Sequence, residues 1–174
     1  MQYPDMEAEQ LKEALSRKFC LPKTYFLPGN GASELFLGIL HALKPKKVIL
    51  PVPSFYGYAY TAKAVGSEVV CVPLKKEEDF LPGEELVLAL QEDAELLFLA
   101  NPNNPTGKLM KPAYLENVLE VCKEKNIYVV LDECFIEFCE KENSMVQKLS
   151  TYRNLLIVRA FTKIYAIPGV RLGY

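Results

Sequence analysis

The chain has 174 residues, half of them hydrophobic, a length that can bury one sizeable core and corresponds to about one domain. Twenty basic residues against 22 acidic ones give a formal net charge of -2, which supplies no field to attract a nucleic acid or an anionic membrane. We therefore expect neither nucleic acid nor membrane as a partner, but a small molecule or another protein.

The N-terminal sequence and the cysteines indicate the compartment. Residues 1–10 carry acid and proline where a signal peptide carries basic charge and an apolar run, and no later segment approaches the length of a membrane span. The five cysteines are odd in number and scattered, without the close pairs of a zinc site or the density of a disulfide scaffold. We expect a soluble cytoplasmic protein with reduced thiols and no bound metal.

Two helices are predicted before the first strand. From Glu7 to about Phe19, apolar residues recur every four positions among charged neighbours, as on one face of an amphipathic helix. The stretch Leu27–Gly31 breaks this pattern, and a strongly apolar helix is predicted over Glu34–Leu43. Ser33 stands just before that helix and is the expected N-cap.

The rest of the chain alternates short apolar runs with segments of helical length. The runs are bounded by turn residues and predict five buried strands: Lys47–Leu50, Glu68–Val72, Leu96–Ala100, Ile127–Leu131 and Leu155–Val158. Between them we expect helices near Tyr56–Val65, Gly83–Gln91 and Pro112–Lys125, the last with a proline suited to a first turn. This alternation predicts an α/β fold of three layers, in which helices flank a mostly parallel sheet.

Polar motifs follow three of the predicted strands at their carboxyl ends. N-P-N-N-P-T-G occupies Asn101–Gly107, D-E-C-F occupies Asp132–Phe135, and F-T-K occupies Phe161–Lys163. In an open α/β sheet the ligand sits beyond the carboxyl ends of the strands, so we expect these motifs to form one site. Taken singly, each is also typical of a tight turn or of a capping carboxylate.

The order of the motifs carries a family resemblance. N-P-N-N-P-T-G, then D-E-C-F, then T-K-I-Y-A-I-P-G-V-R-L-G-Y resembles the class I/II aminotransferase family of fold-type I enzymes, which depend on pyridoxal phosphate (PLP). The resemblance runs from the Y-P-D near Tyr3 to the last residue. It implies the PLP-binding large domain of that family, and PLP as the cofactor. PLP works by imine formation and by drawing electrons from the substrate into a protonated pyridine ring.

The resemblance implies roles for four residues around the cofactor ring. Lys163 would form the imine and carry a proton once substrate displaces it. Asp132 would pair with the pyridine nitrogen and raise the pKa of that nitrogen. Asn104 would donate its amide to the ring oxygen. Phe55, in P-S-F-Y-G-Y, would stack on the pyridine, with ordinary packing at a helix start as the alternative.

The phosphate of the cofactor needs backbone N–H groups at a helix start and a fixed cation. The turn G-A-S-E opens the apolar helix, and the N–H groups of Ala32 and Ser33 would be the donors. Arg171, eight residues beyond Lys163, matches the family arginine that binds the same phosphate. Thr162 is a further candidate hydroxyl donor.

One position departs from the commonest family pattern. Many aminotransferases carry tyrosine where this chain has Phe135, and that hydroxyl normally shares the ring oxygen with the asparagine, so Asn104 would act alone here. The motif D-E-C-F-I-E-F together with the lysine segment resembles the branch of threonine-phosphate decarboxylases and histidinol-phosphate aminotransferases. We expect threonine-phosphate decarboxylation, with histidinol-phosphate or other transamination as the alternative.

The family's chains are longer, with an N-terminal arm before Y-P-D and a smaller domain after R-L-G-Y, so residues 1–174 are expected to be a partial large domain. The complete enzyme is expected to be a homodimer, because the family builds each active site from both subunits. An inactive cofactor-binding or regulatory fragment is the non-enzymatic alternative. His41 and Cys134 match no catalytic position, and we expect a packed or surface histidine and a small buried side chain.

Overall fold

The computed structural model describes residues 5–90 and 93–174. Tyr3 of the Y-P-D motif and the predicted helix end at Gln91 lie outside the described residues. The helices of the described part agree closely with the predicted ones and are α1 (Glu9–Phe19), α2 (Ala32–Leu43), α3 (Tyr56–Ala64), α4 (Glu84–Ala89), α5 (Pro112–Glu124) and α6 (Phe161–Ile164). The short α6 has no predicted counterpart, because four residues are too few to show a helical period.

The five predicted strands are confirmed and form one parallel sheet in the order β2-β1-β3-β4-β5. Their bounds are β1 (Lys47–Val52), β2 (Glu68–Pro73), β3 (Leu96–Ala100), β4 (Tyr128–Asp132) and β5 (Leu155–Val158). The register pairs Ala100 with Asp132 and Asp132 with Val158. The carboxyl ends of β3, β4 and β5 therefore lie at one level, beside one another.

The start of α2 differs from the prediction, and the expected N-cap at Ser33 is wrong. Gly31 is the N-cap, with φ 81° and ψ 167°, and the helix begins at Ala32. Glycine reaches positive φ without the clash that a Cβ causes, so the chain turns into the helix two residues earlier than the apolar pattern predicts. Ser33 consequently lies in the first turn of α2, where backbone N–H groups have no partner within the helix.

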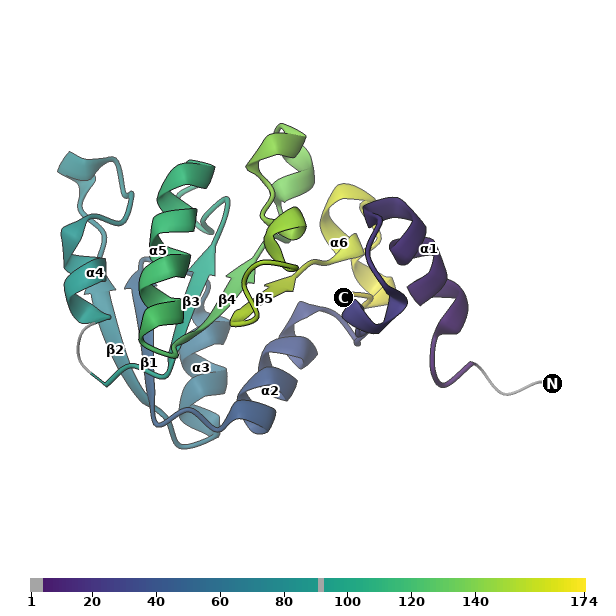
Figure 1. The fold of residues 1–174 in the computed structure, drawn as a ribbon, viewed down its shortest axis with the longest axis horizontal. Coiled ribbons are helices and arrows are strands. Elements are labelled where there is room, and N and C mark those ends of the chain that lie inside the picture. The colour runs from purple at the N-terminus through teal and green to yellow at the C-terminus, as the bar shows by residue number, and fades with distance from the viewer. Residues whose placement is uncertain (1–4, 91–92) are drawn as a thin grey trace.

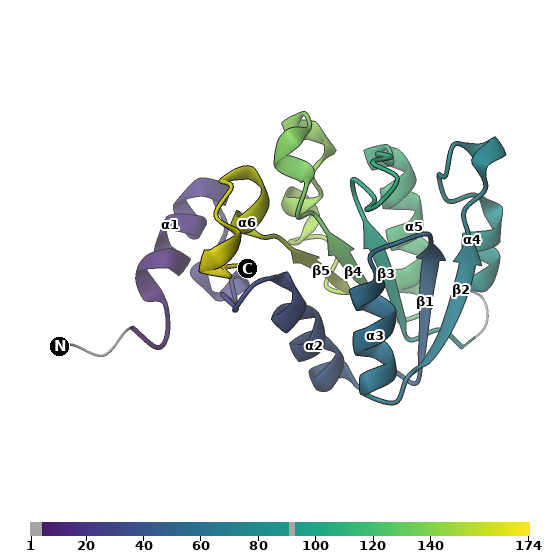
Figure 2. The same ribbon diagram turned by 180° about the vertical axis from the view of Figure 1, so that it is seen from behind.

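Helices cover both faces of the sheet, which confirms the three predicted layers (Figures 1 and 2). Along β3, Leu96 and Phe98 pack with α2 and α3, whereas Leu97 and Leu99 pack with α4 and α5. All four are at most 3 % exposed, and burying such a side chain contributes roughly 1.5–3 kcal/mol. Burial on both faces explains why the strand sequences are continuously apolar rather than alternating.

A smaller apolar cluster joins α1 to the C-terminal segment. Leu15, Phe19 and Phe26 are buried in it, and Phe161 and Tyr174 pack against them. Figure 1 shows α1 and α6 side by side beyond β5, at the end of the sheet away from β2. The cluster therefore connects the first helix of the chain with the segment that contains the candidate lysine.

The last residues of the chain lie against the start of α2. Gly173 forms antiparallel bridges with both Gly29 and Ala160. A Cβ at position 173 would lie 3.0 Å from the backbone nitrogen of Ala32, so this close approach needs glycine. Figures 1 and 2 both show the C-terminus beside the first turn of α2. The bridges bring the R-L-G-Y segment to the helix start that the sequence predicts as the phosphate site.

Within the described residues, no helix combines the length and the apolar character that crossing a membrane would require. All five cysteines are free thiols, and Cys134 is buried, as predicted for a small packing residue. His41 is exposed on α2, so of the two expected alternatives, a packed or a surface histidine, the structure shows the surface one.

Candidate active site

The carboxyl ends of three adjacent strands carry the predicted motifs. β3 leads into N-P-N-N-P-T-G, β4 ends at Asp132, and β5 leads through Arg159 and Ala160 into α6, which contains Lys163. A hydrogen bond from the N–H of Asn101 to the carbonyl oxygen of Asp132 (2.9 Å) continues the pairing beyond β3. The structure thus brings the three motifs to one edge of the sheet, as the strand order requires.

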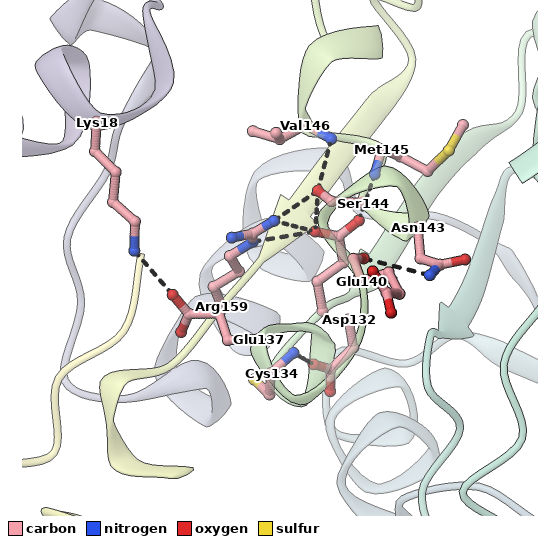
Figure 3. Close-up of polar contacts among 11 residues, drawn as sticks. Lys18, Asp132, Cys134, Glu137, Glu140, Asn143, Ser144, Met145, Val146 and Arg159 are labelled. Carbon is pink, nitrogen blue, oxygen red and sulfur yellow. Dashed lines mark hydrogen bonds and ion pairs between the residues drawn. The ribbon is translucent and has the colours of Figure 1, made fainter. Parts of the chain in front are cut away.

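Asp132 is held by hydrogen bonds to both of its carboxyl oxygens. Oδ1 accepts from the backbone N–H of Cys134 at 2.8 Å, a contact drawn in Figure 3, and Oδ2 accepts from the hydroxyl of Tyr58. Burial raises the pKa of Asp132 above its ordinary value. The hydrogen bonds from Cys134 and Tyr58 and the positive charge of Lys163 act in the opposite direction. The residue is therefore a fixed carboxyl group whose proton affinity responds to whatever cation faces it.

Tyr58 is a site residue that the sequence reasoning missed. Its side chain is 1 % exposed, stacks on Phe98 with ring centroids 4.9 Å apart, and meets Phe36 edge-on at 5.1 Å. A buried tyrosine hydroxyl needs a hydrogen-bond partner, and here the partner is Asp132, 74 residues away in the chain. The available signal was the spacing Phe55-x-x-Tyr58, which places both rings on one face at the start of a helix.

Phe55 is the N-cap residue of α3 and is half-buried. Its ring meets Tyr58 at 5.5 Å between centroids and at 80°, and it lies over the backbone of Gly57. A Cβ at position 57 would lie 2.3 Å from Cε1 of Phe55, so any larger residue there would push the ring away. The structure therefore shows the predicted packing at a helix start, against the tyrosine that contacts Asp132, and stacking of Phe55 on a cofactor ring stays a prediction.

Two of the three asparagines in the N-P-N-N-P-T-G loop form hydrogen bonds within the described part of the chain, and the third does not. Asn101 is fully buried and exchanges two hydrogen bonds with the backbone of Met110, at 2.7 and 3.3 Å. Asn103 donates to Thr106 Oγ1 at 2.8 Å and to the carbonyl of Pro53 at 3.1 Å. No hydrogen bond within the described part of the chain involves the half-buried side-chain amide of Asn104. The loop is thus braced by its first and third residues, which leaves Asn104 for a ligand.

Lys163 is exposed in α6, directly after the buried Thr162. Its ammonium lies 5.4 Å from the ring centroid of Phe135, within the range of a cation–π contact. Its positive charge counteracts the burial that raises the pKa of Asp132. The residue that replaces the family's usual tyrosine therefore contacts the candidate imine lysine.

The start of α2 and Arg171 form the predicted anion site. Arg171 has φ 52°, and its guanidinium packs so closely on Gly31 that a Cβ there would lie 2.8 Å from Nη2. No described side chain caps this end of α2, and the N–H groups of Ala32 and Ser33, in its first turn, have no intrahelical partner. Glu34 closes the other side of the turn, where it accepts the N–H of Asn30.

Lys163 and Arg171 belong to one closed loop. The N–H of Phe161 donates to the carbonyl oxygen of Leu172 at 3.1 Å. The chain from Phe161 to Leu172 therefore leaves the end of β5 and returns to it. The lysine and the arginine are thereby presented together at the carboxyl edge. These groups fit the parts of PLP one by one. A lysine can react with its aldehyde, and a hydrogen-bonded carboxyl group can pair with its ring nitrogen. An aromatic ring can stack on its planar ring, and a guanidinium at a helix start can bind its phosphate.

The fold and this edge define an α/β protein whose site suits a planar anionic cofactor. The chain belongs to the aminotransferase class I and II family, whose model matches residues 1–174. This confirms the family predicted from the motifs, which is a family of PLP-dependent enzymes.

Two relatives represent the two activities of the predicted branch. The chain is 35 % identical over 172 residues to the threonine-phosphate decarboxylase of Salmonella typhimurium, covering 99 % of this chain and 47 % of that protein. It is 39 % identical over 174 residues to the histidinol-phosphate aminotransferase of Symbiobacterium thermophilum, again covering 99 % and 47 %. The chain spans about half the length of the curated relatives it matches.

A solved structure supports the same assignment. The histidinol-phosphate aminotransferase from Clostridium acetobutylicum matches with a TM-score of 0.89 and 33 % identity, over 99 % of this chain and 51 % of that one. The predicted α/β fold, a parallel sheet flanked by helices, is therefore confirmed.

Proposed function

We propose that this protein uses PLP to act on a small amino acid or amine, with decarboxylation of threonine phosphate as the leading reaction. The observation that carries the proposal is the carboxyl group of Asp132, which is held by Tyr58 and Cys134 at the edge where Lys163 and Arg171 also lie. When bound, PLP supplies an electron sink that this chain's own side chains lack.

Lys163 would hold the cofactor covalently through Nζ. Its exposed side chain lies beside the ring of Phe135, where the deprotonated amine would be accessible to a carbonyl compound. Once released by substrate, the same group could donate a proton to the carbon that has lost carbon dioxide, or, in the alternative transamination, move the proton of that carbon. One residue would thus anchor the cofactor and move the proton.

Asp132 would pair with the ring nitrogen of the cofactor. Burial alone raises the pKa of this carboxyl group, and a cationic ring nitrogen would lower it again by favouring the charged form. Tyr58 and the N–H of Cys134 keep the carboxyl group in place for that contact. Asp132 would therefore hold a proton on the ring nitrogen and keep the electron sink charged.

The remaining contacts would orient the cofactor. The N–H groups of Ala32 and Ser33 with the guanidinium of Arg171 would bind its phosphate, Phe55 would stack on its ring, and Asn104 would donate to its ring oxygen. Thr162 is retained as a candidate hydroxyl donor. With Phe135 in place of tyrosine, Asn104 would be the side-chain donor to that oxygen.

The reaction is proposed from the relatives. Threonine-phosphate decarboxylase and histidinol-phosphate aminotransferase are both represented among them, and each of these names includes a phosphorylated small molecule. Phe135 within D-E-C-F-I-E-F favours the decarboxylase, with histidinol-phosphate transamination as the second candidate. The complete enzyme is proposed to be a cytoplasmic homodimer in which residues 1–174 form part of the large domain. An inactive cofactor-binding or regulatory fragment is the non-enzymatic alternative.

The cofactor is tested by titrating the chain with PLP and recording near-visible absorbance before and after borohydride reduction. An absorbance band that reduction converts into a stable covalent adduct supports the proposal. A chain that stays colourless and unlabelled at saturating PLP contradicts it.

The reaction is tested in a protein of the relatives' length. It is given threonine phosphate, and separately histidinol phosphate with 2-oxoglutarate, while carbon dioxide and glutamate are measured. Carbon dioxide from threonine phosphate is the expected result. Glutamate without carbon dioxide would replace decarboxylation by transamination and leave the cofactor assignment standing.

A further inference from the structure

A buried ion pair lies directly behind the candidate site. Glu133 is 1 % exposed and Arg159 is 6 % exposed. The guanidinium donates from Nε and Nη2 to Oε2 of Glu133, at 3.0 and 2.6 Å. Removing two charges from water is costly unless their partners are well placed, and the net stabilisation from such a pair is often small. The main effect of this ion pair is therefore expected on the positions of the residues around it rather than on stability.

The pair is enclosed by further hydrogen bonds. Ser144 donates to Oε2 of Glu133 at 2.9 Å and accepts from Nη2 of Arg159 at 2.6 Å, and the N–H of Met145 donates to Oε1 at 2.7 Å. Figure 3 shows Arg159, Ser144 and Met145 converging on this point. Both carboxyl oxygens of Glu133 are thus occupied, which leaves the pair little freedom to rearrange.

Each member of the pair is adjacent to a candidate catalytic group. Glu133 directly follows Asp132, and its N–H donates to the carbonyl of Val158 at 2.8 Å, which extends the β4–β5 ladder. Successive side chains at a strand end point to opposite faces. Asp132 therefore reaches Tyr58 on the α3 face, while Glu133 meets Arg159 on the other.

Arg159 connects this strand end to the lysine and arginine loop. It follows β5 and stands four residues before Lys163. Its N–H donates to the carbonyl of Tyr174 at 2.8 Å, and the N–H of Tyr174 donates back at 2.9 Å. Its guanidinium also lies 5.1 Å from the ring centroid of Phe19 in α1. One side chain and its backbone thus contact the ends of β4, of β5 and of the loop that contains Arg171.

We propose that Glu133 and Arg159 are positioning residues, whose ion pair sets the placement of Asp132 relative to Lys163 and Arg171. The inference rests on the proposed function, because it concerns the groups assigned there to the cofactor. Neither residue touches the reacting atoms. Since a displacement of about 1 Å in a reacting group can cost about a hundredfold in rate, loosening the pair is expected to slow the chemistry.

The test compares Glu133→Gln and Arg159→Lys with the matched control Glu137→Gln. Glu137 pairs with Lys18 at 2.8 Å on a neighbouring turn (Figure 3), and among the described residues no side-chain hydrogen bond or ion pair joins either of them to Glu133 or Arg159. The readouts are the rate at which Lys163 links to PLP, followed by near-visible absorbance, and the pH midpoint of that absorbance band. Both pair variants are expected to link about tenfold to a hundredfold more slowly and to shift the midpoint, while the control keeps wild-type values.

A double variant, Glu133→Leu with Arg159→Met, keeps the test decisive if a lone buried charge prevents folding. It removes both charges together, and such replacements are often tolerated in stability. A folded double variant with wild-type linking rate and wild-type midpoint overturns the inference, and so do single variants that lose thermal stability but match the control in both readouts. A wild-type chain that never links PLP overturns the proposed function instead, and with it this inference.

Discussion

The two ends of the candidate site differ in burial. At one end, the carboxyl group of Asp132 accepts hydrogen bonds from the buried hydroxyl of Tyr58 and from a backbone N–H. At the other end, Arg171 is exposed and packs on Gly31 at the start of α2. Burial and packing have already set the geometry and the proton affinity at the first end. At the second end, the positive charge of the guanidinium and N–H groups without an intrahelical partner can attract and bind an anion. We call the first the ring end and the second the phosphate end, after the part of PLP that each would bind. The ring end should therefore control chemistry, and the phosphate end should control affinity.

Changing Lys163 is the largest expected disruption of the ring end. Lys163→Ala should abolish covalent trapping of PLP, because Nζ is the proposed attachment point. Borohydride reduction followed by peptide mass mapping checks this, and in the wild-type chain the label should be found on Lys163 alone. Lys108→Ala is the control, since Lys108 pairs with Asp79 in the neighbouring loop. A pyridoxyl label on another lysine, with Lys163 unmodified, would show that the attachment point is wrong.

Asp132→Asn comes next and keeps the side-chain shape while removing the charge. In a protein of the relatives' length, turnover should fall by about a hundredfold or more, because an uncharged amide cannot hold the ring nitrogen protonated. Binding of PLP should change far less than turnover. The measurement is kcat beside a PLP titration of the same variant. Unchanged turnover would refute the division of labour between the two ends.

Arg171→Ala should show the opposite pattern, weakening affinity more than chemistry. Loss of a charge-assisted contact to a dianion corresponds to about 1.5–3 kcal/mol, or roughly tenfold to a hundredfold in Kd for PLP. Pyridoxal, which lacks the phosphate, should bind the variant almost as well as it binds the wild type. Parallel titrations with both ligands check the difference. An equal loss for both would mean that Arg171 acts through folding.

The same contrast separates what the sequence could predict from what it could not. Continuous apolar runs such as Leu96–Ala100 predict strands that are buried on both faces, and the polar motifs behind them predict the site edge. Local patterns predicted Asp132 and Lys163 at this edge, and the family resemblance added Arg171. The start of α2 was misplaced because a positive φ at Gly31 depends on the approach of Arg171 and the C-terminal segment, and neither is a neighbour in sequence.

Long-range contacts account for the residues that were missed. Tyr58 looks like an ordinary helix aromatic until α3 packs on the sheet and its hydroxyl reaches Asp132. Glu133 and Arg159 look like solvated charges until β4 and β5 pair. Periodicity reports which face of an element is buried, but it does not report which polar groups on two elements meet.

The smallest predicted effect concerns Tyr58→Phe in the cofactor-free chain, and it depends on pH. Because the folded pKa of Asp132 is raised above the ordinary value of 3.8, its contribution to stability is complete below that value and is lost as pH rises through the folded pKa. The Tyr58 hydrogen bond favours the charged form, so removing it raises the folded pKa further and enlarges the loss. The destabilisation by Tyr58→Phe should therefore grow with pH, by about 1 kcal/mol, as hydrogen bonds to charged groups exceed neutral ones.

Urea unfolding of wild type and variant at a series of pH values measures this difference, and other titrating groups cancel because both proteins contain them. Tyr60→Phe is the matched control, since that hydroxyl belongs to the same helix but its side chain is 71 % exposed. It should leave the free energy of unfolding unchanged at every pH. A Tyr58→Phe effect that is constant with pH would mean that the hydroxyl does not discriminate between the charged and the neutral carboxyl group. In that case the proton affinity of Asp132 would have to depend on burial, on Lys163 and on the hydrogen bonds from Cys134.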